Sequence, residues 1–206
     1  MTKEVTSNSP TPSSPSISPI TVGVLALQGS FREHSTALRR LPGVTALEVR
    51  SAEELKECDG LVIPGGESTT ISRLIDKNHL YKPIRNFSGG IFATCAGMVL
   101  IATHVDDARI NTLGLIDMTV DRNAFGRQRE SFETDIPLTG IEGGPFHAIF
   151  IRAPVAIHAG AGVTVLSRLD QGIVAVEQGK HMALSFHPEL GGDTRLHERF
   201  LKKIGV

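Results

Sequence analysis

The chain has 206 residues, with 21 Lys and Arg against 22 Asp and Glu, so its formal net charge at pH 7 is −1. This balance argues against a nucleic-acid-binding surface or a membrane-binding patch, and no apolar run approaches the roughly 20 residues of a membrane span. Two cysteines, Cys58 and Cys95, are too few for a disulfide framework or a cysteine-rich zinc site, so a reducing, cytoplasmic setting is expected.

The N-terminal segment differs in composition from the rest of the chain. Residues 6–19 consist mostly of Ser, Thr and Pro and lack the apolar core of a signal peptide. Such a segment buries too little apolar surface to offset the entropy that is lost on ordering. We therefore expect a disordered tail over residues 1–19 and one folded domain over residues 20–206, a length that suits a single core.

Apolar runs alternate with helical patterns through the first half of the domain. Strands are predicted at 20–27, 44–49, 61–63 and 91–94. Helices are predicted at 30–41 (capped by Ser30), 52–57, 68–76 and 79–87, and from the bend at Cys95 to about residue 104. This alternation favours a parallel sheet covered by helices on both faces.

The second half of the domain is richer in strands. They are predicted at 115–120, 132–136, 148–151, 163–167, 173–177 and 181–186, and a closing helix at 194–204 with Asp193 as a candidate cap. The short turns between these strands require some antiparallel pairing. We expect one α/β domain whose open sheet is of mixed direction, with helices on both faces.

The most informative local pattern lies at residues 90–100, an apolar run interrupted by Cys95 between small residues. This pattern is typical of a strand that turns sharply into a helix and exposes one side chain on the bend. The N-terminus of the helix favours a thiolate there. The alternative is a buried structural thiol, the usual state of a free cysteine.

A second pattern, His187-Pro188-Glu189, offers the groups that a nucleophilic thiol needs. Pro188 disfavours helix for the residue before it, so we expect an extended tripeptide with the Glu189 carboxylate beside the His187 ring. The carboxylate would set the tautomer and leave the other ring nitrogen to take a proton from Cys95. In the alternative, His187 is an ordinary surface histidine. Gly65-Gly66, Cys95 and His187 each follow a predicted strand, so they are expected at one sheet edge.

The motifs resemble those of a known family. The matching segments are V-G-V-L-A-L-Q-G at 22–29, R-E-H at 32–34, P-G-G-E-S-T-T at 64–70, T-C-A-G at 94–97, R-N-A-F-G-R-Q at 122–128, S-F-E at 131–133, F-I-R-A-P at 150–154 and S-F-H-P-E-L at 185–190. Together they resemble the class I (triad) glutamine amidotransferases, which have a flavodoxin-like fold, and within them the glutaminase subunits of pyridoxal 5′-phosphate synthase. One departure is Ala93, where the family commonly has glycine.

The resemblance implies hydrolysis of L-glutamine to glutamate and ammonia, without a metal or cofactor. Cys95 would be the nucleophile, His187 the proton carrier and Glu189 its orienting group. The amide of Ala96 and one from Gly65-Gly66 would form the oxyanion hole. The residues implied for glutamine binding are Gly66, Glu67, Ser68, Arg122, Ile151 and Arg152. The guanidinium of Arg122 suits the substrate carboxylate. For Glu67 the sequence leaves two roles open, which are pairing with the substrate ammonium and stabilising a helix N-terminus.

The resemblance also implies a partner, because free ammonia would be lost to protonation and diffusion. This partner is the barrel-shaped synthase subunit, with the Gln28-Gly29 loop and the following helix as the candidate docking face. His34 is assigned to that partner-facing surface, and Cys58 and the histidines at 104, 147, 158, 181 and 197 are expected to be ordinary residues. Open alternatives are another acceptor enzyme, a catalytically silent assembly subunit and a cysteine peptidase.

Overall fold

The computed structural model describes residues 19–125 and 131–205. The predicted tail therefore lies outside the described residues except for residue 19, as do residues 126–128 of the R-N-A-F-G-R-Q motif. The helices are α1 (Phe31–Leu38), α2 (Ala52–Lys56), α3 (Ser68–Lys77), α4 (Tyr81–Arg85), α5 (Ala96–Ile101), the 3₁₀ helix η1 (Pro188–Leu190) and α6 (Arg195–Ile204).

The strands form one large sheet and one small ribbon among the described residues. They are β1 (Ile20–Leu25), β2 (Val44–Val49), β3 (Gly60–Ile63), β4 (Gly90–Thr94), β5 (Ala102–Val105), β6 (Ile116–Asp121), β7 (Ser131–Ile136), β8 (Phe146–Ile151), β9 (Val155–Ala159), β10 (Thr164–Leu169), β11 (Gly172–Gln178) and β12 (His181–Leu184). The sheet order is β2-β1-β3-β4-β12-β11-β9-β6-β5, with β10 paired to β11, and β7 pairs with β8 alone.

The pairing of neighbouring strands changes from parallel to antiparallel across the sheet. Strands β2, β1, β3, β4 and β12 are parallel neighbours, whereas β11, β9 and β6 pair antiparallel. Among the parallel strands, β3 and β4 are buried along their whole length, which explains their nearly continuous apolar sequence. The predicted open mixed sheet is confirmed.

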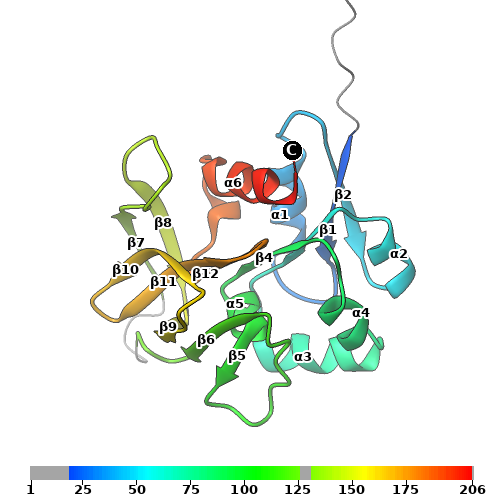
Figure 1. The fold of residues 1–206 in the computed structure, drawn as a ribbon, viewed down its shortest axis with the longest axis horizontal. Coiled ribbons are helices and arrows are strands. Elements are labelled where there is room, and N and C mark those ends of the chain that lie inside the picture. The colour runs from blue at the N-terminus through cyan, green and yellow to red at the C-terminus, as the bar shows by residue number, and fades with distance from the viewer. Residues whose placement is uncertain (1–18, 126–130, 206) are drawn as a thin grey trace, which may run out of the picture.

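The helices cover both faces of the sheet (Figure 1). One face packs on α3 and α5, whose Ile71, Ile75 and Met98 are buried there. The other packs on α1 and α6, where Leu38 and Phe200 are fully buried. The β7–β8 ribbon adds Phe146 and Phe150 to this second cluster, so it is anchored beside the sheet rather than within it.

Two strands of the large sheet, β5 and β9, lie where the sequence analysis predicted none. The helix after Cys95 ends at Ile101, because Ala102 adopts extended geometry (φ −64°, ψ 156°) and starts β5, which pairs parallel with β6. The strand at Val155–Ala159 was not predicted. Its sequence V-A-I-H-A follows Pro154 and is too short to show a period, yet β6 and β11 on either side supply hydrogen-bond partners for it. Pairing between distant segments decided both elements.

Candidate active site

Cys95 lies on a strained bend between β4 and α5. Its φ of 49° and ψ of −108° place a non-glycine residue at positive φ, and its amide donates to the carbonyl of Leu184 at 2.8 Å. Gly97 lets α5 lie against β3, because a Cβ there would be 2.2 Å from the carbonyl oxygen of Ile63. Ala93 is fully buried in β4, and the bend forms with alanine at this position. Strain of this kind is concentrated at functional sites.

The imidazole of His187 lies beside Cys95. A Cβ placed on Gly65 would be 2.5 Å from Cε1 of His187 and 3.2 Å from Cβ of Cys95, so the two side chains meet at one point beside the Gly65 backbone. Nδ1 of His187 is 2.7 Å from Oε1 of Glu189. All three side chains are more than nine-tenths buried. The structure therefore brings together Cys95, His187 and Glu189, as the sequence predicted.

The conformation of the His187-Pro188-Glu189 segment differs from the extended tripeptide that was expected. His187 has φ −109° and ψ 84°, and Pro188 then begins η1. Proline fits the first position of such a turn because its fixed φ is helical and its missing N–H has no partner there anyway. The turn still brings the Glu189 carboxylate onto Nδ1, so the expected contact forms by a different backbone path.

The electrostatics of this pair match a proton carrier and its orienting group. Burial lowers the pKa of His187, but its interactions with Cys95 and Glu189 outweigh burial and raise the pKa to about 10. Burial raises the pKa of Glu189, but His34, His187 and Ser30 outweigh it and lower the pKa to about 2. At neutral pH His187 therefore holds a proton and Glu189 is ionised, the charge state that stabilises a thiolate at Cys95.

Two residues that the sequence analysis did not assign to the site bind the triad carboxylate. The hydroxyl of Ser30 donates to Oε1 of Glu189 at 2.7 Å, and it makes no side-chain cap for α1, contrary to expectation. Nε2 of His34 is 3.2 Å from Oε2. His34 is fully buried, so its assignment to the partner-facing surface was wrong. The four-residue spacing of Ser30 and His34 on one helix face, just after β1, was the available signal.

The glycine loop after β3 holds one of its amides away from the reaction centre. The Gly65 amide donates to Oγ1 of Thr94 at 3.1 Å, and the Gly65 carbonyl accepts from the Ser30 amide at 3.0 Å. Within the described part of the chain, the Gly66 amide makes no hydrogen bond. The amide of Ala96 is the first of α5 and has no partner within the helix. Of the predicted oxyanion donors, Ala96 and Gly66 are available in this conformation and Gly65 is not.

Glu67 acts as the N-cap of α3. Its carboxylate accepts from the amides of Thr69 and Thr70 at 3.2 and 2.7 Å and from both threonine hydroxyls. Burial raises its pKa, but these hydrogen bonds outweigh burial and lower it to about 2. Ser68 is buried as the first residue of the helix. The carboxylate is thus engaged by the helix terminus, the second of the two roles that the sequence left open.

The remaining predicted glutamine-binding residues border the same region. Arg122 pairs with Asp107, and its Nη2 is 3.4 Å from Oε1 of Glu67. The carbonyl oxygen of Ile151 is 3.6 Å from Sγ of Cys95, and Arg152 has a positive φ of 46°. No sequence signal marked Asp107, because its partner lies 15 residues away. Ile151 therefore contacts the thiol itself, and Arg122 contacts Glu67 at the end of the glycine loop.

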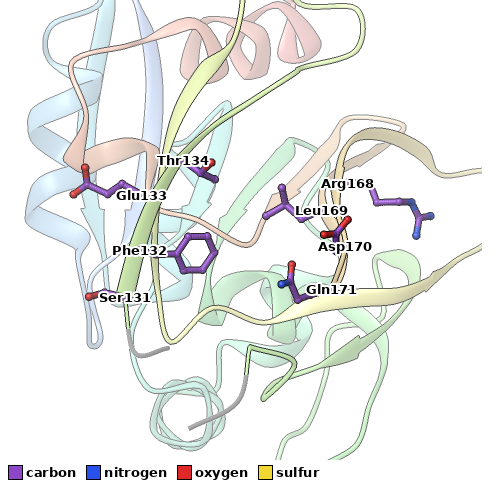
Figure 2. A pocket seen from close by; sticks show the side chains of 8 residues that line it. All are labelled: Ser131, Phe132, Glu133, Thr134, Arg168, Leu169, Asp170 and Gln171. Carbon is purple, nitrogen blue, oxygen red and sulfur yellow. The ribbon is translucent and has the colours of Figure 1, made fainter. Parts of the chain in front are cut away.

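A groove of about 650 Å³ lies elsewhere, where β7 faces β10 and the turn after it. Figure 2 shows Phe132 and Leu169 on opposite sides of it. Its lining includes none of the predicted site residues, so it is separate from the Cys95 centre. Among residues 19–125 and 131–205, no group of three or more His, Cys, Asp or Glu side chains is arranged to hold a metal ion. In the same ranges no helix has the length and apolarity to cross a membrane.

Comparison with known proteins agrees with this geometry. A protein of Methanoregula boonei named pyridoxal 5′-phosphate synthase subunit PdxT is 67% identical over 192 residues, which are 90% of this chain and 99% of the relative. One of the same name from Methanosphaerula palustris is 61% identical, over 91% of this chain and 98% of the relative.

The fold is shared with a solved structure described as a glutamine amidotransferase. It superimposes with a TM-score of 0.84 at 49% identity, over 90% of this chain and 99% of that one. This match confirms the flavodoxin-like class I amidotransferase fold. The model of the SNO glutamine amidotransferase family matches residues 24–205. The chain therefore belongs to the SNO glutamine amidotransferase family.

Proposed function

We propose that this chain hydrolyses L-glutamine to glutamate and ammonia and delivers the ammonia to a pyridoxal 5′-phosphate synthase, in vitamin B6 biosynthesis. The observation that carries the proposal is the assembled Cys95–His187–Glu189 group, with Nδ1 of His187 2.7 Å from the carboxylate. Family membership and the synthase-subunit names of the relatives at 67% and 61% identity support it.

The reaction proceeds through a covalent thioester. The Cys95 thiolate attacks the side-chain amide carbon of glutamine, and the C–N bond breaks as His187 gives its proton to the leaving ammonia. Water, losing a proton to His187, then hydrolyses the thioester to glutamate. Each tetrahedral intermediate carries an oxyanion, which the amides of Ala96 and the glycine loop stabilise.

We assign glutamine recognition to the segments that border the thiol. Arg122 binds the α-carboxylate, because a guanidinium matches a carboxylate with two hydrogen bonds, and its contacts with Asp107 and Glu67 hold it beside the glycine loop. Ile151, Arg152 and the segment Gly66 to Ser68 form the remaining walls. Glu67 contributes mainly by fixing the start of α3 beside this loop.

The partner is a synthase subunit with a barrel fold, in a hetero-oligomeric complex, and docking raises the activity of this chain. The Gly65 amide is bound to Thr94, so one oxyanion donor is withheld until the loop rearranges. Oε1 of Gln28 accepts from the Glu67 amide at 2.9 Å, so a partner that moves the Gln28-Gly29 segment acts directly on this loop. The complex works in the cytoplasm, where a catalytic thiol stays reduced.

The test is ammonia release by wild type and Cys95→Ala, each with and without the synthase subunit. We expect activity from wild type that rises on mixing, and none from Cys95→Ala although the complex still forms. Undiminished ammonia release by Cys95→Ala would refute the triad. Wild type that binds the synthase without releasing ammonia would identify a silent assembly subunit, and a different acceptor recovered by pull-down would replace the synthase.

A further inference from the structure

A buried histidine lies directly behind the triad. His34, on α1, has no exposed surface, and its ring packs edge-on against Phe92 with 6.2 Å between centroids. Its Nε2 is 2.9 Å from Oγ1 of Thr94 and 3.2 Å from Oε2 of Glu189. One nitrogen atom therefore contacts both the triad carboxylate and the hydroxyl that holds the Gly65 amide.

Hydrogen-bond accounting assigns the proton of His34 to Nε2. Oε2 of Glu189 is buried and makes no hydrogen bond among the described residues, and Nε2 of His34 lies 3.2 Å from it. A buried carboxylate oxygen needs a donor, so an N–H on this nitrogen suits the oxygen better than a lone pair. The other tautomer would set the Nε2 lone pair against that oxygen and leave an N–H at Nδ1, which is buried without a partner. A buried orphan N–H is rarer than an unfilled acceptor, so the Nε2–H form is favoured.

The ring is neutral in this arrangement. Burial lowers the pKa of His34, and nearby His187 lowers it further, against the opposing effects of Glu189 and Glu33. A second histidine, His197, lies 5.8 Å away between ring centroids, and burial and the neighbouring His34 lower its own pKa to about 3. In the Nε2–H form, His34 is thus a neutral ring that points an N–H dipole toward the carboxylate and does not compete with His187 for its proton.

We propose that His34 is a positioning residue that, through one Nε2–H, holds Oε2 of Glu189 and the Thr94 hydroxyl and so links the proton carrier to the oxyanion loop. The chain of contacts runs from His187 through Glu189, His34 and Thr94 to the Gly65 amide. This inference rests on the proposed glutaminase function, because it assigns His34 a role in that same site.

Loss of the Nε2–H donor of His34 should affect catalysis, whereas loss of packing volume at this position should affect only stability. Without this donor, Oε2 is buried with no donor nearby, and the carboxylate turns away from His187. Groups that orient the ligands of a catalytic metal contribute about 10- to 100-fold to activity, and we take the same magnitude for a group that orients a catalytic carboxylate. The loss falls on kcat rather than on KM, because His34 contacts the triad carboxylate and not the residues assigned to glutamine binding.

The test compares His34→Leu, which removes the donor, with His34→Gln, whose amide nitrogen can take the place of Nε2–H. His197→Leu is the matched control, because His197 is buried beside His34 and neither of its ring nitrogens has a partner among the described residues. With the synthase present, we expect His34→Leu to lower kcat about 10- to 100-fold with KM within about twofold. His34→Gln should recover most of that loss, and His197→Leu should behave as wild type.

Two further readouts separate positioning from simple packing. The pH profile of Cys95 alkylation by iodoacetamide should move to higher pH in His34→Leu and not in His197→Leu. When Glu189 is displaced it supports the protonated form of His187 less, and the protonated ring is what favours the reactive thiolate. In wild type, ¹⁵N shifts of His34 should show Nε2 protonated and Nδ1 bare at pH 7. This measurement needs no variant, so a failure of His34→Leu to fold does not remove the test.

The inference is overturned if His34→Leu keeps the kcat and alkylation profile of wild type, if Leu and Gln variants are equally impaired, or if ¹⁵N shifts show the Nδ1–H or cationic ring. Failure of the proposed function has a different signature, which is undiminished ammonia release by Cys95→Ala. If Cys95→Ala is silent while His34→Leu is fully active, only the role of His34 is refuted.

Discussion

Gly65→Ala places a methyl group between the thiol and the imidazole. The new Cβ would be 2.5 Å from Cε1 of His187 and 3.2 Å from its Nδ1, whereas ordinary contacts begin near 3.4 Å. The ring must therefore yield by ~0.9 Å, because the Gly65 backbone is held by bonds to Thr94 and Ser30. A displacement of about 1 Å in a catalytic group costs about 100-fold in rate, or about 2.7 kcal/mol of transition-state stabilisation.

We expect glutamine hydrolysis by the Gly65→Ala complex to fall about 100-fold in kcat, measured as ammonia release at saturating glutamine. The control is Gly192→Ala, since a Cβ at Gly192 meets nothing within 4 Å and its φ is not positive. Both variants should bind the synthase subunit and unfold near the wild-type urea midpoint. A Gly65→Ala complex with kcat within twofold of wild type would refute the reasoning that the imidazole and thiol meet at this glycine.

Three further predictions concern stability and its pH dependence. Gly97→Ala should lower the free energy of unfolding by about 1–3 kcal/mol, because its Cβ would be 2.2 Å from the Ile63 carbonyl oxygen; an unchanged urea midpoint would contradict the close packing of α5 on β3. Burial lowers the pKa of His197 to about 3, so the contribution of its neutral ring to the free energy of unfolding is complete above the ordinary pKa of 6.5 and is lost as pH falls toward 3. His197→Leu should therefore lose about 2 kcal/mol less stability than wild type between pH 7.5 and pH 5, and equal losses would argue against a neutral buried ring. The pKa of His187 is raised to about 10, so its contribution to the free energy of unfolding is present below pH 6.5 and is lost as pH rises through 10. Cys95→Ala removes the interaction with the thiol and should lower the NMR titration midpoint of His187. An unchanged midpoint would show that Cys95 does not act on the ring.

The sequence predicted the local chemistry well where a few adjacent residues suffice to specify geometry. The bend at Cys95 requires small neighbours and a helix start, and both are visible within residues 93–97. The contact between His187 and Glu189 needs only two residues of separation, and it formed even though the backbone between them turns rather than extends. Short-range constraints of this kind survive errors in the assumed backbone path.

Errors arose where the outcome depends on a distant partner. The strand at Val155–Ala159 and the change from helix to strand at Ala102 exist because neighbouring strands offer hydrogen bonds to them. His34 reads as part of an amphipathic surface helix, yet it is fully buried because Thr94 and Glu189, 60 and 155 residues later, supply polar partners inside. The four-residue spacing of Ser30 and His34 shows that the two residues share a helix face, but it does not show which distant residues that face contacts.

The amino-acid sequence alone predicted the family and the open α/β sheet with helices on both faces, and it singled out Cys95, His187 and Glu189 as the candidate nucleophile, proton carrier and orienting carboxylate. Periodicity carries the prediction of the sheet and its helices, and the resemblance of the motifs to those of known amidotransferases carries the family. Only the tertiary structure decided which groups surround the carboxylate, that Ser30 and His34 complete it, and that the Gly65 amide is bound to Thr94. A hydrogen bond in a protein interior depends on sub-ångström placement of groups from different strands, and that placement exists only after the sheet has assembled.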